Sequence, residues 1–181
     1  MTPPDVTLED GSTPARPEDL LRRLDELDIL HQTATHAPVF TVEEAKAVRD
    51  DLPGGHTKNL FLRNKKGEMW LVVCQEDRLV DLKALARHLG AGRFSFSSAD
   101  RLRRFLGVEP GAVSPFAVIN DKLARVKVVV DLAVLGYERV NFHPLDNSMT
   151  TAIAGDDLMK FLRAEGHAPE VTDLGAWEHK A

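Results

Sequence analysis

The stretch HTKNLFLR (residues 56–63), NKKGE (64–68) and MWLVVCQ (69–75) decides the fold, because it reads as two β-strands joined by a polar turn containing glycine. The second strand is apolar on both faces, which is typical of the centre of a sheet. Lys58 stands at the start of the first strand. An unpaired ammonium is costly to bury, so this lysine either extends toward water or meets a negative or strongly dipolar group.

Helical and strand-like segments alternate on both sides of this hairpin. Apolar residues at helical spacing, together with capping residues, predict helices over residues 17–27, 41–50, 81–90, 97–106 and 155–164. Apolar runs or alternation predict further strands at residues 93–97, 116–120, 126–130, 140–143 and 148–154. Because neighbouring strands form hairpins, we expect a mixed α/β fold, with a mixed central β-sheet surrounded by helices.

The length of 181 residues suits one well-buried domain, which we place at residues 17–166. Residues 1–16 are rich in proline and lack periodicity, so they are expected to form a flexible arm. Residues 167–181 are polar and are expected to form a C-terminal tail.

Composition and charge narrow the class of protein. The formal net charge of −5 argues against a general DNA-binding protein, whose surface should be basic. No apolar run approaches the roughly 20 residues that span a bilayer, so no membrane partner is expected. The single cysteine, Cys74, excludes an intrachain disulfide and fits a reducing cytoplasm. Inside an apolar strand it reads as a small hydrophobic residue.

Several standard catalytic motifs are absent from the sequence. It contains no GxGxxG, GxxxxGK[ST], HExxH, CxxC or GxSxG motif. The seven histidines are scattered and show no strong metal-ligand spacing. We therefore expect neither a metal nor a cofactor.

Three polar stretches coincide with strand ends or loops, where functional sites are usually built. They are residues 56–59, the Gly/Pro-rich loop 107–115, and residues 143–150. Each also has a purely structural explanation, as a snorkelling lysine, a connector or a corner. Together they predict a small pocket with a fixed cation, backbone donors and a histidine, but without an obvious nucleophile.

The same three stretches carry a resemblance to a known family. HTKNLFL, GVEPGAVSPF and NFHPLDNSMTT occur in the order and at the spacing of the YbaK/ProX family, relatives of the editing domain of bacterial prolyl-tRNA synthetase. The resemblance covers roughly residues 20–165 and is strongest to the ProX (ProXp-ala, PrdX) type, which deacylates Ala-tRNA(Pro). It implies a curved central sheet and metal-independent hydrolysis of a mischarged aminoacyl-tRNA ester.

The resemblance also implies roles for individual residues. Lys58 and His143 are the expected catalytic residues: Lys58 holds the substrate near its ester or terminal ribose phosphate, and His143 orients the attacking group. The loop would bind the aminoacyl group and polarise its carbonyl, through Gly107, Val108, Pro110, Gly111, Val113 and Ser114. The hydrogen-bond partners are expected to be Asn59, Asn147 and Thr150.

The expected partner is the acceptor end of tRNA(Pro), with transient encounters with prolyl-tRNA synthetase or an elongation factor. Candidates for phosphate contacts are Arg63, Lys65, Lys66, Arg101, Arg103 and Arg104, although a charge run is usually a solvated face. Two alternatives stay open. The substrate could be Cys-tRNA(Pro) or a Ser/Thr-type mischarged tRNA, or the chain could be a non-catalytic nucleic-acid-binding module.

Overall fold

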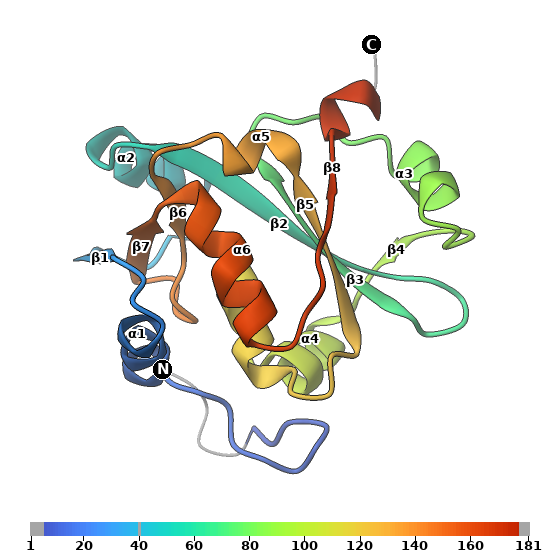
Figure 1. Cartoon of the computed structure of the whole chain (residues 1–181), viewed down its shortest axis with the longest axis horizontal. Helices are drawn as coiled ribbons and strands as arrows, with labels where there is room; N and C mark the ends of the chain where they lie inside the picture. Colours follow the sequence, from blue (N-terminus) through green and yellow to red (C-terminus); the bar gives the residue numbers. More distant parts are fainter. Residues whose placement is uncertain (1–5, 40, 178–181) are drawn as a thin grey trace.

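A mixed β-sheet runs through the computed structural model, which describes residues 6–39 and 41–177. Its strand order is β1-β7-β6-β2-β3-β5-β8, and β4 pairs with β2 outside this order (Figure 1). The strands are β1 (Gln32–Thr35), β2 (Gly55–Arg63), β3 (Met69–Gln75), β4 (Ser95–Phe96), β5 (Val126–Asp131), β6 (Val140–Phe142), β7 (Met149–Ile153) and β8 (Glu170–Thr172). The pairs β2–β6, β3–β5 and β5–β8 are parallel and the others antiparallel, which confirms the predicted mixed sheet.

The predicted hairpin is the centre of this sheet. Strands β2 and β3 pair in continuous antiparallel register from Thr57 opposite Gln75 to Arg63 opposite Met69. The turn closes where Gly67, at φ +83°, donates its N–H to the carbonyl of Asn64. Strand β2 also begins alongside β6, so it joins the part of the sheet that carries β6, β7 and β1 to the part that carries β3, β5 and β8.

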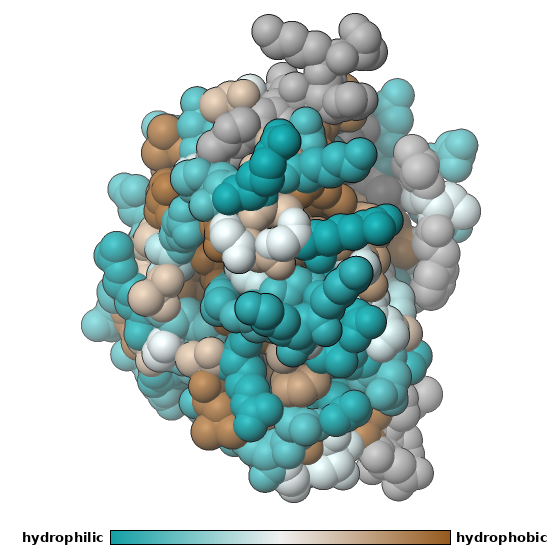
Figure 2. Space-filling view, turned by 90° about the vertical axis from the view of Figure 1, so that its right-hand side faces the viewer, coloured by the Kyte–Doolittle hydropathy of each residue, from teal (hydrophilic) through white to brown (hydrophobic). Residues whose placement is uncertain are grey.

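Helices cover both faces of the sheet. They are α1 (Pro17–Glu26), α2 (Val42–Asp51), α3 (Leu82–His88), α4 (Ala99–Leu106), α5 (Leu132–Leu135), α6 (Gly155–Ala164), and the 3₁₀ helices η1 (Pro115–Asn120) and η2 (Leu174–Trp177). A capping box starts α2, with Thr41 and Glu44 each accepting from the backbone N–H of the other. On the side that carries α3, β4 and the tip of the β2–β3 hairpin, the surface is largely hydrophilic (Figure 2).

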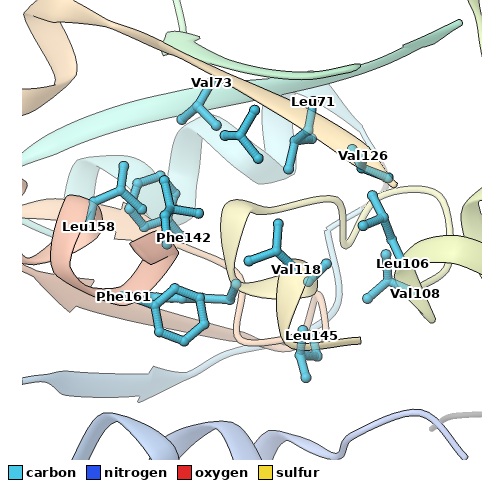
Figure 3. Close-up of a cluster of buried hydrophobic side chains, with 14 of the residues drawn as sticks. Leu71, Val73, Leu106, Val108, Val118, Val126, Phe142, Leu145, Leu158 and Phe161 are labelled. Atoms are coloured by element: carbon cyan, nitrogen blue, oxygen red, sulfur yellow. The ribbon is translucent and has the colours of Figure 1, made fainter. Parts of the chain in front are cut away.

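Two hydrophobic clusters form because alternate residues of β3 point to opposite faces. Leu71 and Val73 join the larger cluster, which α1, α4, η1 and α6 close (Figure 3). Trp70 and Val72 join the smaller cluster beneath α3 and η2. No helix in the described ranges is both long and apolar enough to cross a membrane.

One predicted strand is wrong. Residues 116–120 form the 3₁₀ helix η1 and do not pair with β5. Pro115 at the first position lacks an N–H and presets a helical φ, and Ser114 caps the turn by accepting from the backbone N–H of Phe116 at 3.1 Å. The apolar run is buried on all sides, so it resembles a strand in sequence.

Parts of the predicted arm and tail pack against the domain. Leu8 is 4% exposed, and Glu9 forms an ion pair with Arg104 at 2.6 Å. At the other end, residues 170–172 pair with β5 as β8, and Leu174 donates its N–H to the carboxylate of Asp131 at 3.3 Å. Residues 1–5 and 178–181 lie outside the described ranges.

Candidate functional site

A cavity of about 100 Å³ lies where β2 begins beside β6, and it reaches toward α2 and β7. Side chains from three parts of the sequence, residues 39–59, residue 76 and residues 141–150, line it: Val39, Val48, Leu52, His56, Thr57, Asn59, Glu76, Asn141, Phe142, His143 and Thr150. Three of the predicted site residues, Asn59, His143 and Thr150, therefore share one cavity.

His143 follows β6, and its backbone contact determines which ring nitrogen carries the proton. Its Nδ1 lies 2.8 Å from the carbonyl of Met149. A carbonyl can only accept, so Nδ1 donates and the neutral ring keeps its lone pair on Nε2. Burial lowers the pKa of His143 below the usual 6.5, and the neighbouring His36 acts in the same direction. At pH 7 this residue is therefore a neutral acceptor on the cavity wall.

Thr150 is held in a similar way by His36. Nδ1 of His36 donates to the carbonyl of Ala37 at 2.8 Å, which leaves Nε2 as an acceptor in the neutral ring. The hydroxyl of Thr150 lies 2.9 Å from this Nε2 and donates to it. With its proton used in this way, the Thr150 oxygen can only accept from a ligand in the cavity.

Asn59 supplies a third acceptor. Its Oδ1 is buried and has no hydrogen-bond partner among the described residues. A buried polar atom without a partner costs about 1–3 kcal/mol, so this oxygen favours a ligand that donates to it. Nearby, Asn141 holds the start of β2 through bonds from its Nδ2 to the carbonyls of Pro53 and Gly55, at 3.0 and 3.1 Å.

The lining as a whole can bind a group rich in N–H or O–H donors. His143 Nε2 and Thr150 Oγ1 are acceptors on residues that line the cavity, Asn59 Oδ1 is buried without a partner on a third lining residue, and the carboxylate of Glu76 adds a negative charge to the wall. The neutral His143 can also take a proton from a bound hydroxyl or water. Among the residues that the structure describes, no group of three or more His, Cys, Asp or Glu could hold a metal ion.

Lys58 does not line this cavity. It pairs with Cys74 across the β2–β3 hairpin and points to the face of the sheet opposite Thr57 and Asn59, since strand residues alternate. Its ammonium donates to the backbone carbonyl of Arg78, in the loop after β3. The structure therefore separates Lys58 from His143, which the sequence analysis placed in one pocket.

The loop of residues 107–115 lies outside the cavity lining. Val108 and Ser114 are buried, Ser114 as the cap of η1, and none of the loop residues lines the cavity. Gly107 packs so closely against Asn120 that an added Cβ would lie 2.6 Å from its Nδ2. Pro110 and Gly111 are exposed and Val113 is partly buried.

Asn147 connects this loop to the cavity wall. A Cβ added to Gly111 would lie 3.6 Å from Nδ2 of Asn147, so the two residues are neighbours. The same Nδ2 donates to the carbonyl of Val39 at 3.3 Å, and Val39 lines the cavity. The predicted Gly111 and Asn147 thus support the wall from outside.

Sequence reasoning did not single out His36 or Asn141, and it included His56 and Thr57 only as members of the polar stretch 56–59. Alternation along β2 was the available signal for Thr57, because it shares a face with Asn59. His36 had no such signal: it meets Thr150 only because β1 pairs with β7.

Comparison with known proteins identifies relatives of this chain. Residues 36–161 match the model of the aminoacyl-tRNA editing domain. The chain is 40% identical over 156 residues to the prolyl-tRNA editing protein ProX of Acetoanaerobium sticklandii, covering 86% of this chain and 95% of that protein. It is also 40% identical over 157 residues to prolyl-tRNA synthetase associated domain-containing protein 1 of Xenopus laevis, covering 84% and 93%.

A solved structure shares the fold. A candidate trans-editing enzyme for prolyl tRNA synthetase superposes with a TM-score of 0.67 at 18% identity, over 88% of this chain and 96% of that one. The matched range contains Asn59, His143 and Thr150, and His36 is its first residue. The chain belongs to the aminoacyl-tRNA editing domain family, the YbaK/ProX family that its three motifs resemble.

Proposed function

We propose that the chain is a trans-editing deacylase that hydrolyses the ester of mischarged Ala-tRNA(Pro). Its family membership and the editing activity in the name of its ProX relative support this function. The observation that carries the proposal is a neutral histidine with an available Nε2 in a small cavity that also holds an unpartnered buried oxygen.

In the proposed reaction, His143 acts as the general base. Its Nε2 takes the proton from an attacking water as the water oxygen bonds to the ester carbonyl carbon. The bond from this carbon to the ribose oxygen then breaks, and the imidazolium returns the proton to the leaving oxygen. Proton transfer of this kind contributes about 10²–10⁴-fold to the rate.

The three acceptors provide a basis for selecting alanine over proline. A primary α-ammonium has three N–H donors for Asn59, Thr150 and the cavity wall, whereas the ring nitrogen of proline has two. An acceptor left unpaired in a buried site costs about 1–3 kcal/mol, which adds to exclusion by the size of the cavity.

We assign the other predicted residues supporting roles. Lys58 meets a phosphate of the tRNA 3′ end outside the cavity. The loop residues Gly107, Val108, Pro110, Gly111, Val113 and Ser114 act through Asn147, which fixes the wall at Val39. Mischarged tRNA reaches the chain after release from prolyl-tRNA synthetase, in the cytoplasm.

Ester hydrolysis with three substrates tests the function directly. The wild-type protein should deacylate Ala-tRNA(Pro) faster than Cys-tRNA(Pro) and leave Pro-tRNA(Pro) intact. His143→Ala should lose most of this activity, while His31→Ala, which removes a histidine outside the cavity, should retain it. Equal slow loss of all three esters would favour the non-catalytic alternative. Preferential loss of the Cys-tRNA(Pro) ester would show that Cys-tRNA(Pro), and not Ala-tRNA(Pro), is the substrate.

A further inference from the structure

A group of exposed cations covers the side of the molecule that carries α3 and the tip of the β2–β3 hairpin. We call it the basic surface, and it consists of Arg63, Lys65, Lys66, Lys83, Arg87 and Arg93. Figure 2 looks onto this side and shows long hydrophilic side chains gathered over it. None of the six forms an ion pair with a described residue, so their charges are available to a partner.

The charge of this region contrasts with that of the whole chain. Residues 60–104 contain ten Lys or Arg and five Asp or Glu, and three of the ten (Arg78, Arg103 and Arg104) pair with carboxylates outside this range, so a smaller positive excess remains in a chain whose net charge is −5. Such a local excess of positive charge in an acidic protein indicates a specific anionic partner, because a general solubilising surface would carry both signs.

Ion pairs distinguish the basic surface from the neighbouring helix α4. Arg103 pairs with Glu109 at 2.8 Å and Arg104 with Glu9 at 2.6 Å, so these two predicted phosphate contacts are already neutralised within the protein. Among the described residues no carboxylate forms an ion pair with Arg63, Lys65 or Lys66, which were predicted for the same purpose, although the charge of Lys66 contributes to lowering the pKa of Glu68.

The basic surface is also hollowed and carries exposed aromatic area. A cavity of about 600 Å³ lies between α3 and the loop that follows it, with Leu82 and Phe94 among its apolar lining and three of the cations, Lys83, Arg87 and Arg93, in its wall. Phe96 is 64% exposed on β4, beside the hairpin. Cations next to exposed aromatic rings are typical of surfaces that bind nucleic acid.

We propose that the basic surface binds the sugar–phosphate backbone of the tRNA acceptor arm while the 3′ end of the same tRNA occupies the cavity at His143. This inference rests on the proposed function. Six strand residues separate Thr57 at the cavity from Arg63 at the surface, which at about 3.3 Å per residue is roughly 20 Å. The duplex of the acceptor arm thus contacts the hairpin tip and α3, and only the unpaired 3′ end reaches the cavity.

The basic surface then contributes to substrate binding and not to the chemical step. The double variant Lys83→Gln/Arg87→Gln removes two cations from one exposed helix. For Ala-tRNA(Pro) we expect KM to rise roughly three- to tenfold with kcat unchanged, and the slope of log(kcat/KM) against log salt to become shallower by about 1.5.

The matched control is Lys160→Gln/Arg163→Gln on α6. It removes the same pair of residue types from an exposed helix that packs on the other face of the sheet. We expect KM and the salt slope of this control to equal those of the wild type. If both double variants raise KM equally, or neither does, the basic surface is not the docking site.

A second substrate separates this inference from the proposed function. Hydrolysis of 3′-alanyl-adenosine, which lacks the acceptor arm, should be the same in wild type and in Lys83→Gln/Arg87→Gln. A lower rate for the variant would show that the substitutions disturb the cavity and would overturn the docking role. The wild type could instead hydrolyse neither ester but bind uncharged tRNA(Pro) more tightly than the α3 variant. In that case the basic surface binds tRNA as proposed, and the deacylase function is wrong.

Discussion

The hydrogen bond that Nδ1 of His143 donates determines what its other ring nitrogen can do in the cavity. Because Nδ1–H is bound to the carbonyl of Met149 and burial lowers the pKa, the ring is a base at neutral pH. Protonation of Nε2 removes this base. We therefore expect kcat to rise with pH through a pKa below 6.5 and to stay level above it, as measured by single-turnover deacylation between pH 5 and 8.

The His143→Ala variant should lack this rise between pH 5 and 6.5, and its residual rate should lie about 10²–10⁴-fold below the wild type. His31→Ala provides the comparison, because it removes a histidine that contacts Asp25 and does not line the cavity. An unchanged pH profile in His143→Ala would assign the base to another group.

A second prediction for a single residue concerns the hydroxyl of Thr150. Thr150→Val keeps the shape of the side chain but removes both the acceptor for the substrate and the donor to His36. We expect kcat/KM for Ala-tRNA(Pro) to fall about tenfold or more, which corresponds to one lost buried hydrogen bond. Thr150→Ser retains the hydroxyl and should stay close to wild type; an equal loss in both variants would point to packing.

Cys74 is expected to be unreactive. It is fully buried in the cluster beneath α3, and desolvation raises the pKa of its thiol to about 11. Since the thiolate is the nucleophile, a thiol reagent at pH 8 should label the protein only after denaturation. Rapid labelling of the native protein would show that this side of the sheet opens readily.

Strand geometry explains how much of the site the sequence could predict. Sequence reasoning named Asn59, His143 and Thr150, which line one cavity, because polar residues at strand ends are typical of functional sites. It grouped Lys58 with them, although adjacent strand residues point to opposite faces. His36 could not be found, because its contact with Thr150 spans 114 positions and depends on the pairing of β1 with β7.

At the scale of elements, the Gly/Pro-rich loop contains two glycines with different surroundings. Both have positive φ, +64° at Gly107 and +94° at Gly111. A Cβ at Gly107 would lie 2.6 Å from Nδ2 of Asn120, which bonds to the carbonyl of Leu106 and cannot move freely. At Gly111 the nearest atom is 3.6 Å away.

We therefore expect Gly107→Ala to lower the free energy of unfolding by about 2–4 kcal/mol, through strained φ and overlap together. Gly111→Ala should lower the free energy of unfolding by only about 1 kcal/mol, because only backbone strain opposes it. Urea denaturation of both variants measures the difference. Equal losses would mean that Asn120 adapts to the added methyl group.

The element that the sequence misassigned lies directly after this loop. Residues 116–119 are apolar, and Phe116, Ala117 and Val118 are almost fully buried, so this part of the 3₁₀ turn has no polar face to reveal its period. Pro115 and Ser114 were the local evidence for a helical turn. The hairpin and the capped helices were predicted correctly, since their turn and cap residues act within a few positions.

At the scale of the whole molecule, contacts from both ends of the chain close the fold. Glu9 binds Arg104, and Asn120 accepts from the backbone N–H of Ala15 at 2.8 Å. His167 follows α6 and reaches back to Asp121, which also accepts the N–H groups of two later residues. Such partners could not be predicted from local sequence, because polar residues near the termini read as arm and tail.

The pair Asp121–His167 allows the last prediction, because a second His–carboxylate pair with almost the same geometry lies at the surface. Nε2 of His167 is 2.9 Å from Asp121, and both side chains are almost fully buried. Nε2 of His88 is also 2.9 Å from Glu170, but these side chains are 40% and 50% exposed. We expect Asp121→Ala to cost about 3–5 kcal/mol, since it leaves His167 and two backbone N–H groups buried without their partner. Glu170→Ala should cost at most about 1 kcal/mol, because water replaces the lost carboxylate. Urea denaturation at pH 7 measures both, and comparable losses would show that burial does not determine how much each pair contributes to stability.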